Sequence, residues 1–276
     1  MTRIGKTFKK LKRKGRKAFI PYIMAGDPSL ERTGELIGLL ERHGADIVEL
    51  GVPFSDPLAD GPVIQRAAER ALKGGVSLRK VIRFVSDIRR KTQIPLVLMT
   101  YFNPVFRYGL EAFMRDASEA GVDGVIVPDL PPEEAGEYRK LARAHGVDTI
   151  FLVAPTSTEE RRKKIARASS GFLYYVSITG ITGARLALAG EAGESIRALR
   201  EMSGKPVALG FGVSTPEEAR QVAAMADGVI VGSAIVKRIA QDTSAQGTSA
   251  QGTVAPDTGV PDSGLEEFLT SLREAI

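Results

Sequence analysis

The sequence of 276 residues predicts a (β/α)8 barrel, the TIM-barrel architecture, formed as one domain. A short unit recurs along the chain: a glycine, then an Asp within two residues, then an apolar, β-rich run. The apolar runs do not alternate with polar residues, which is typical of parallel strands buried on both faces. Amphipathic stretches separate the runs. The alternative is an open doubly wound sheet, which we disfavour because no glycine-rich dinucleotide loop follows the first run.

The chain begins with a basic extension, residues 1–17, that holds nine Lys or Arg residues and no acid. The rest of the chain has 29 basic and 33 acidic residues and so a net charge of −4. The net charge of +5 therefore originates in this extension. Such a segment could contact nucleic acid or an acidic partner. Because aromatic residues do not alternate with the basic ones and the rest of the chain is acidic, we favour a solvated helix and expect no nucleic-acid partner. Its residues Ile4, Phe8 and Leu11 are spaced to touch the body of the protein.

Eight apolar runs are the predicted strands. Three of them follow a glycine that suits the left-handed residue closing a helix, and the Asp fits the short connection back to the strand. The eight runs are residues 19–25, 46–52, 94–100, 123–129, 148–154, 172–177, 206–212 and 227–232.

The stretches between these runs carry helix start and stop signals. One predicted helix closes at Gly44, and the sequence STPEE at residues 214–218 opens another. A final helix is predicted over residues 265–276, with one apolar face that docks on the barrel. Ser263 and Glu266 form a possible capping box for it.

Residues 241–264 break the pattern. The pentamer TSAQG occurs twice in tandem, and large apolar side chains are scarce. Such a segment cannot bury enough surface to offset the entropy lost on ordering. We therefore predict a flexible, low-complexity insert before the last helix.

Several function classes are excluded by composition. There is no cysteine, so disulfides, thiol nucleophiles and zinc–thiolate sites are absent. No run of about 18 apolar residues could span a membrane, and no apolar region follows the basic N-terminus as in a signal peptide. We expect a soluble, cytoplasmic protein. Both His43 and His145 precede a helix-ending glycine, on the face opposite a barrel's active site, so no metal site is expected.

Carboxylates concentrate after the second predicted strand. Glu49 lies inside the apolar run IVELGV, where burial of a charged carboxylate is costly. Desolvation raises the pKa of such a group, which suits proton transfer near neutral pH. A structural pairing with a basic group is the alternative, but no basic residue lies in a strand core. The following loop, residues 53–62, holds Asp56 and Asp60 among three prolines, and Asp60 could instead cap the next helix.

Glycines follow the last three predicted strands, at residues 177–183, 210–215 and 231–234. Loops in this position, with a helix N-terminus, commonly hold phosphate in barrels because backbone N–H groups can approach the oxygens. Ser233 would cap a short helix there and donate its hydroxyl. No lysine lies at a strand's carboxyl end, which argues against Schiff-base chemistry.

These residues belong to a longer pattern. The stretch VELGVPFSDPLADGP at residues 48–62 resembles the signature of the tryptophan synthase alpha chain family, and the resemblance covers about residues 18–240 plus the closing helix. The basic N-terminus and the low-complexity insert depart from the family. Further matching stretches are residues 18–28, 100–109, 127–134, 177–185, 208–219 and 228–236.

The resemblance implies a lyase of tryptophan biosynthesis that cleaves indole-3-glycerol phosphate to indole and glyceraldehyde 3-phosphate in a retro-aldol reaction. Glu49 matches the family's general acid/base, and Asp60 matches the carboxylate that stabilises the indole N–H. Thr182 matches a residue of a mobile loop that closes toward Asp60. The matched substrate-binding residues are Tyr22, Tyr101, Tyr174, Thr182, Gly183, Phe211, Gly212, Gly232 and Ser233.

By the same resemblance, the chain works with a beta chain in an alpha2beta2 heterotetramer. Pyridoxal phosphate belongs to that partner, which receives the indole through a tunnel, and this chain needs no cofactor or metal. The matched candidates for the interface are Pro53, Asp56, Pro57, Asn103 and Pro132.

Two other interpretations stay open at the level of sequence. One is a different phosphate-binding barrel, such as an indole-glycerol-phosphate synthase, which would require a lysine at a strand end, or a sugar-phosphate isomerase. The other is a catalytically silent binding subunit or a nucleic-acid-associated protein that uses the basic arm.

Overall fold

The structure is a computed structural model that describes residues 1–176, 185–210, 212–248 and 263–276. The side chains of residues 185–191, 243–248 and 263 are not described. The strands are β1 (Ala18–Met24), β2 (Val48–Gly51), β3 (Leu96–Met99), β4 (Gly124–Ile126), β5 (Asp148–Ile150), β6 (Leu152–Val153), β7 (Leu173–Val176), β8 (Val207–Gly210) and β9 (Gly228–Val231).

All strand pairs are parallel, and the strand order is β5-β4-β3-β2-β1-β9-β8-β7-β6. The two ends of this order, β5 and β6, are separated in the chain by Phe151 alone, so the sheet closes into a barrel. The predicted barrel is confirmed, but the fifth predicted strand is two short ones. The N–H of Phe151 donates to Ser169 Oγ (3.3 Å), which takes it out of the strand ladder.

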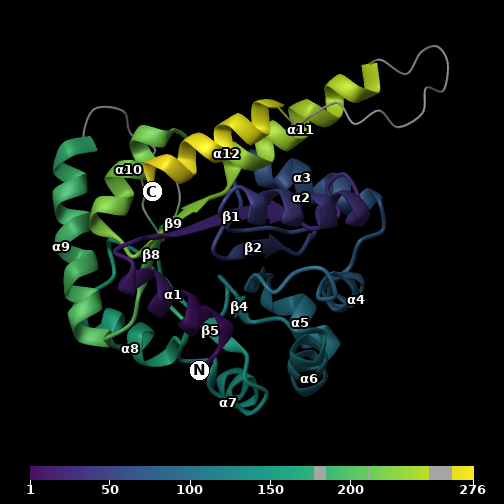
Figure 1. Ribbon diagram of the computed structural model, residues 1–276. Coiled ribbons are helices and arrows are strands. Elements are labelled where there is room, and N and C mark those ends of the chain that lie inside the picture. Colours follow the sequence, from purple (N-terminus) through teal and green to yellow (C-terminus); the bar gives the residue numbers. More distant parts are fainter. Residues whose placement is uncertain (177–184, 211, 249–262) are drawn as a thin grey trace.

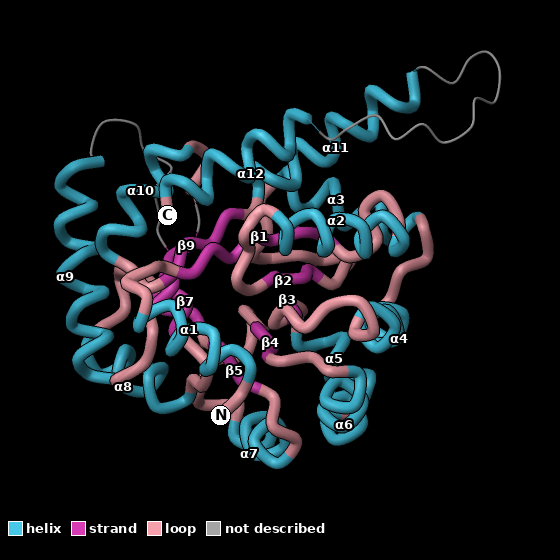
Figure 2. Tube along the Cα trace, viewed as in Figure 1, coloured by secondary structure: helices cyan, strands magenta, loops and turns pink. Residues whose placement is uncertain are grey.

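Helices surround the strands (Figures 1 and 2). They connect consecutive strands and cover the outer faces, so apolar runs buried on both sides make a parallel barrel. No helix in the described ranges is both long and apolar enough to cross a bilayer. The helices are α1 (Arg3–Arg13), α2 (Leu30–Arg42), α3 (Pro62–Lys73), α4 (Leu78–Ile88), α5 (Phe102–Tyr108), α6 (Leu110–Ala120), α7 (Gly136–Ala144), α8 (Glu159–Ala168), α9 (Arg185–Ser203), α10 (Pro216–Met225), α11 (Ser233–Thr248) and α12 (Ser263–Ala275).

The repeated Asp before a strand has a physical role at the amino ends of the barrel strands. Asp46, Asp123 and Asp227 each accept a hydrogen bond from the first amides of a neighbouring strand, at 2.9–3.0 Å. Each of the three carboxylates also pairs with an Arg. A charge-assisted hydrogen bond therefore fixes the register of adjacent strands at this end.

The basic extension is confirmed as a helix that touches the body. Ile4, Phe8 and Leu11 of α1 are buried, and the rings of Phe8 and Phe172 lie 5.6 Å apart. Arg3 pairs with Asp123 (3.0 Å). The helix thus covers the amino ends of the strands, with its apolar face turned inward.

The C-terminal part differs from the prediction in one boundary. Helix α11 continues to Thr248, so the first eight residues of the predicted insert, 241–248, are helical. Buried residues such as Ile235 and Ile239 stabilise the start of this helix. Once a helix has formed, its extension through Ala, Ser and Gln has a small free-energy cost. Residues 249–262 lie outside the described residues. Helix α12 begins at Ser263, and Leu265, Phe268, Leu269 and Leu272 are buried as expected.

Both histidines lie where the sequence placed them, at the C-caps of α2 and α7. His43 Nδ1 is 3.0 Å from Thr270 Oγ1, and His145 Nε2 is 3.0 Å from Glu111 Oε1. Among the described residues, no three His, Asp or Glu side chains are grouped as ligands for a metal ion.

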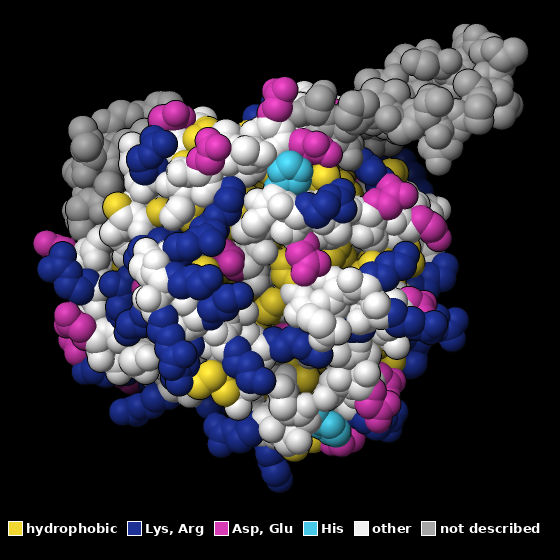
Figure 3. All heavy atoms as spheres, in the orientation of Figure 1, with side chains coloured by type: hydrophobic (Ala, Val, Ile, Leu, Met, Phe, Trp, Pro, Cys, Tyr) yellow, Lys and Arg dark blue, Asp and Glu magenta, His cyan; other side chains and the backbone are white. Residues whose placement is uncertain are grey.

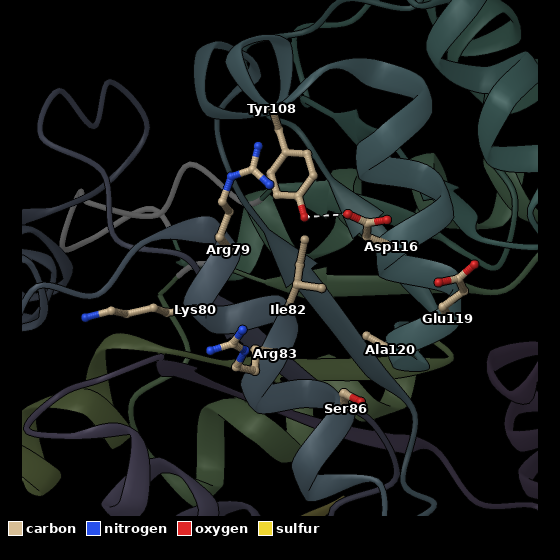
Figure 4. A pocket seen from close by; sticks show the side chains of 9 residues that line it. All are labelled: Arg79, Lys80, Ile82, Arg83, Ser86, Tyr108, Asp116, Glu119 and Ala120. Carbon is tan, nitrogen blue, oxygen red and sulfur yellow. Dashed lines mark hydrogen bonds between the residues drawn. The ribbon is translucent and has the colours of Figure 1, made fainter.

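The hollow between α4 and α6 is organised around Tyr108 at the end of α5 (Figure 4). The Arg79 guanidinium lies over the Tyr108 ring, 4.0 Å from its centroid. The Tyr108 hydroxyl donates to Asp116 Oδ2 (2.7 Å). This bond, followed by one from Arg115, holds the pKa of Asp116 below its usual range. These contacts join three helices, and Lys80 and Glu119 point away from each other (Figure 4). The cluster is therefore part of the packing.

We expect Tyr108→Phe to lower the free energy of unfolding by about 1 kcal/mol, because it removes a hydrogen bond to a carboxylate at a half-exposed site. Tyr138→Phe should have the opposite sign. The Tyr138 hydroxyl is buried and has no hydrogen-bond partner among the described residues, so its loss relieves a desolvation cost. Urea titrations of the two variants measure both effects. Equal shifts in the same direction would contradict this account.

Candidate active site

A cavity of about 290 Å³ opens at the carboxyl ends of the strands. This is the end at which (β/α)8 barrels place their chemistry, and the volume suits a small molecule. Side chains from β1, β2, β3, β7 and β9 reach it from below, and loop and helix residues close it above. The lining residues are Tyr22, Glu49, Ala59, Asp60, Gly61, Ile64, Met99, Tyr174, Gly212, Val213, Ser214, Ile230, Gly232, Ser233 and Ala234.

Glu49 lies on β2 at the floor of this cavity. Its side chain is 1% exposed, and neither carboxylate oxygen has a hydrogen-bond partner among the described residues. Burial, and secondarily the negative charge of Asp60, raise the pKa of Glu49 to about 8. The structural alternative, an ion pair between Glu49 and a buried basic group, is not found among the residues that the structure describes. The group is therefore placed to release and regain a proton near neutral pH.

Asp60 lies across the cavity from β2, in the loop before α3. Gly61 is the N-cap of α3, and Gln65 Nε2 donates to the main-chain oxygen of Asp60 (2.8 Å), so the Asp60 carboxylate does not cap the helix. Burial raises the pKa of Asp60, while a hydrogen bond from the Tyr101 hydroxyl opposes the rise. The same hydroxyl accepts the N–H of Ala59 (3.0 Å).

Tyr101, which the resemblance placed among the substrate-binding residues, contacts the loop that carries Asp60 and is not one of the residues named above as lining the cavity. It is buried and its ring lies 5.3 Å from that of Phe54. Its hydroxyl connects the carboxyl end of β3 to the loop after β2. Tyr101 is thus placed to orient Asp60.

Tyr22 and Tyr174 do line the cavity, and each lies across a glycine of the next strand. A methyl group at Gly51 would collide with the Tyr22 hydroxyl, and one at Gly210 would collide with the Tyr174 hydroxyl. Burial raises the pKa of both tyrosines, and the charges of Glu49 and Asp60 add to it. Both hydroxyls therefore stay protonated beside the two carboxyl groups. No role was predicted for these two glycines, although both lie in stretches that match the family.

The N-terminus of α11 forms another part of the cavity wall. The Gly232 carbonyl accepts the Val236 N–H (3.1 Å), so Gly232 occupies the N-cap and Ser233 is the first helical residue. The prediction that Ser233 caps a short helix is therefore wrong in both respects. The N-cap is Gly232, and α11 is not short, since it has 16 residues. Gly212 has φ +83°, a conformation that favours glycine. The first N–H groups of a helix lack partners within it and favour an anion such as phosphate.

Three predicted substrate-binding residues, Thr182, Gly183 and Phe211, lie outside the described residues. Ser214 also lines the cavity, although it was predicted only as part of a helix start. Its N–H and Oγ both donate to Glu218 Oε2 at 2.8 Å. The apolar lining residues that were not predicted occupy strand ends, a first helical turn and the loop after β8. They are Ile64, Met99, Val213 and Ile230.

The residues expected at a partner interface are distributed unevenly. Asp56 and Asn103 are exposed, and Pro57 and Pro132 are half-buried. Pro53 is buried, so the structure leaves it no free surface for a partner. Two large apolar side chains that sequence reasoning did not single out are exposed nearby in the chain: Leu58 by 88%, in the loop after β2, and Phe106 by 65%, in α5.

Burial of Glu49 predicts a pH-dependent cost to folding. Its folded-state pKa lies above the unfolded value, so the contribution of Glu49 to stability is greatest below about pH 4.5 and is lost as the pH rises from there through about 8. Glu49→Gln cannot ionise and should escape this loss, which makes it more stable than the parent by about 3–5 kcal/mol above pH 8.5 and similar to it at pH 5. Urea unfolding of both proteins from pH 5 to 9 measures the difference. A constant difference across that range would contradict the burial of an ionisable carboxyl.

Comparisons with known proteins were made for sequence and structure. The sequence model of one family, described as tryptophan synthase alpha chain, matches residues 8–257. A tryptophan synthase alpha chain of Geobacter sulfurreducens is 55% identical over 244 residues, which are 88% of this chain and 92% of the relative. One of Picosynechococcus is 49% identical over 277 residues and covers both chains completely.

Solved structures agree with this similarity. The tryptophan synthase alpha subunit of Legionella pneumophila aligns with a TM-score of 0.88 and 41% identity over 100% of this chain and 98% of its own. A chain of tryptophan synthase from M. tuberculosis, in an aminoacrylate-bound form, aligns with a TM-score of 0.85 and 36% identity over 100% of both chains.

Proposed function

This chain belongs to the tryptophan synthase alpha chain family, and we propose that Glu49 and Asp60 carry out the proton transfers of its reaction. Its activity is the family's lyase reaction in tryptophan biosynthesis, in which indole-3-glycerol phosphate is cleaved to indole and glyceraldehyde 3-phosphate. A retro-aldol cleavage of this kind requires a proton at indole C3 and the removal of a proton from a glycerol hydroxyl.

One observation carries the assignment of Glu49. It is a carboxyl group with no hydrogen-bond partner in the described part of the chain, held by burial at a pKa of about 8, in a cavity that ends at a helix N-terminus. At pH 7 most of it is protonated, so it can donate a proton to indole C3. The resulting carboxylate can then accept the hydroxyl proton as the carbon–carbon bond breaks and its electrons return to the ring. The proton count balances with a single residue that acts first as acid and then as base.

Asp60 has the complementary role. Protonation of C3 places positive charge on the indole nitrogen, and a carboxylate beside the N–H stabilises that charge. The hydrogen bond from Tyr101 favours the ionised form of Asp60. Two carboxyl groups in different environments, one protonated and one ionised, are the arrangement that this chemistry uses.

The phosphate of the substrate is proposed to bind at the N-terminus of α11, against Gly212, Gly232 and Ser233. Helix geometry supports this, since the N–H groups of Ser233 and Ala234 are the first of the helix and both residues line the cavity. Thr182, Gly183 and Phe211 are proposed to complete the pocket. Tyr22 and Tyr174 would enclose the indole and glycerol portions.

The chain is proposed to act in the cytoplasm with a beta chain in an alpha2beta2 assembly. Pyridoxal phosphate is proposed to belong to the beta chain, since no lysine lines the described part of this cavity. A partner seated on the loops after β2 and β3 would cover Leu58 and Phe106 next to Asp56, Pro57 and Asn103, with Pro132 on the loop after β4. Apolar side chains beside polar ones are typical of an interface.

An indole-release assay tests the function. The purified chain, given indole-3-glycerol phosphate, should release indole and glyceraldehyde 3-phosphate in equal amounts, and faster when a beta chain is added. Closure of the loops over the cavity is the physical reason for the acceleration. Release of neither product, with or without the beta chain, would refute the activity. Release that the beta chain leaves unchanged would refute only the partnership.

A further inference from the structure

A second cleft, of about 480 Å³, lies between α1 and the barrel, on the side opposite the active site. Gly171, Pro206 and Asp227 of its wall precede β7, β8 and β9, which places it at the amino ends of these strands. The other wall is α1 and the residues that follow it. Neither the proposed reaction nor the proposed partner surface uses this cleft.

The lining of this α1 cleft is strongly basic. Among the described residues, its lining contains six Lys or Arg residues and one acid, Asp227, which already pairs with Arg200 at 2.9 Å. Figure 3 shows Lys and Arg side chains gathered over α1. The six basic residues are Lys9, Lys12, Arg16, Lys17, Arg200 and Lys205.

In the part of the chain that the structure describes, Lys205 is the basic side chain that the barrel wall places in the cleft without an ion pair. It is half-buried, its Nζ donates to the Ala166 carbonyl (2.8 Å), and it has no carboxylate partner among the described residues. Burial, and secondarily repulsion by Arg139, lower the pKa of Lys205. An anion in the cleft would offset both effects, because it would supply the missing negative charge next to the ammonium group.

The surroundings restrict the kind of anion. The apolar residues of α1 are turned into the barrel, so the helix has no face to insert into a membrane. No aromatic side chain of the cleft is exposed, so there is no platform on which the bases of a single strand could stack, and no apolar anchor for a protein partner. The volume is that of a small-molecule site, and its charge exceeds that of one phosphate group.

We propose that the α1 cleft binds a small polyphosphate, organic or inorganic, with two or more phosphate groups. Lys9, Lys12 and Arg16 contribute charge from the α1 side, and Lys205 from the barrel side. Because both walls hold the ligand, binding fastens α1 to the barrel and stabilises the folded chain.

The test is a calorimetric titration of the full chain with inorganic tripolyphosphate, and separately with ATP, at low salt. Saturating glycerol 3-phosphate is present so that the proposed phosphate site at the N-terminus of α11 is occupied. We expect one site, and a melting temperature that rises with ligand concentration. Binding of both probes would define a general polyphosphate site, and binding of ATP alone would restrict it to nucleotides. Failure of both to bind would overturn the proposal.

The helix provides a matched control. The triple variant Lys9→Gln, Lys12→Gln, Arg16→Gln removes three charges from the cleft, whereas Lys6→Gln, Lys10→Gln, Arg13→Gln removes three exposed charges of α1 that do not line it. The cleft variant should bind tripolyphosphate at least tenfold more weakly, and the control variant less than threefold. Equal losses of affinity in the two triple variants would overturn the proposal. They would indicate diffuse electrostatic attraction along α1, of the kind that binds a long nucleic acid. Lys205→Gln, which leaves α1 intact, should weaken binding at least threefold.

Discussion

Glu49→Gln is expected to lower the turnover number for indole release by at least about a thousandfold, while the KM for indole-3-glycerol phosphate stays within a fewfold of the parent value. Positioned acid–base groups contribute about 10²–10⁴ to rates, and here one group performs two transfers. The amide has nearly the same shape as the protonated carboxyl group, so the cavity should keep its form. A loss in turnover without a loss in binding indicates an interaction made only in the transition state.

The matched control for this variant is Asp87→Asn, which neutralises an exposed carboxylate on the outside of α4. It should release indole at the parent rate. The stability of Glu49→Gln, measured under the assay conditions, separates lost chemistry from lost folding. Indole release by Glu49→Gln at the parent rate would show that another group moves the proton.

The sequence predicts the barrel well because its strands carry a strong physical signal. Runs such as residues 94–100, apolar on both faces, have few alternatives to a parallel sheet covered by helices. Glu49 stands out for the same reason, since a carboxylate within such a run is costly to bury and its burial is confirmed. The docking of α1 through Ile4, Phe8 and Leu11 follows from helical periodicity.

Other features depend on contacts between distant segments, which a pattern along the chain does not contain. Tyr101 looks like a pocket residue from its place after β3, but its hydroxyl accepts the Ala59 N–H and so turns it toward the loop. Gly51 and Gly210 look like ordinary strand glycines until a tyrosine of the neighbouring strand is seen above each. The break at Phe151 depends on Ser169, 18 residues away.

Helix ends are also weakly specified. Ser233 has the side chain of a good N-cap, and sequence preference alone assigned it that role. In the structure the backbone turns one residue earlier, and the Gly232 carbonyl accepts the first helical hydrogen bond. The basic extension was judged by its overall charge, whereas the cleft that it forms with Lys205 and Arg200 exists only once α1 lies against the barrel.

Asp60→Asn is expected to reduce the turnover number by about a hundredfold, because it removes the charge that stabilises the protonated indole ring. It should also change the pH dependence of what remains. The negative charge of Asp60 raises the pKa of Glu49, so its removal lowers that pKa from about 8, although burial still keeps it above the ordinary value. The alkaline limb of kcat/KM, where Glu49 loses its proton, should therefore move to lower pH in this variant.

Tyr101→Phe supplies the complementary comparison for Asp60. Its hydroxyl favours the ionised form of Asp60, so its loss should raise the pKa of Asp60 and move the acid limb of the profile to higher pH, with the alkaline limb nearly unchanged. Activity measured from pH 5 to 9.5 for the parent and both variants distinguishes the two carboxyl groups. If Asp60→Asn left the alkaline limb in place, the two groups would not interact across the cavity, and the two-carboxylate mechanism would fail whether or not each residue is needed.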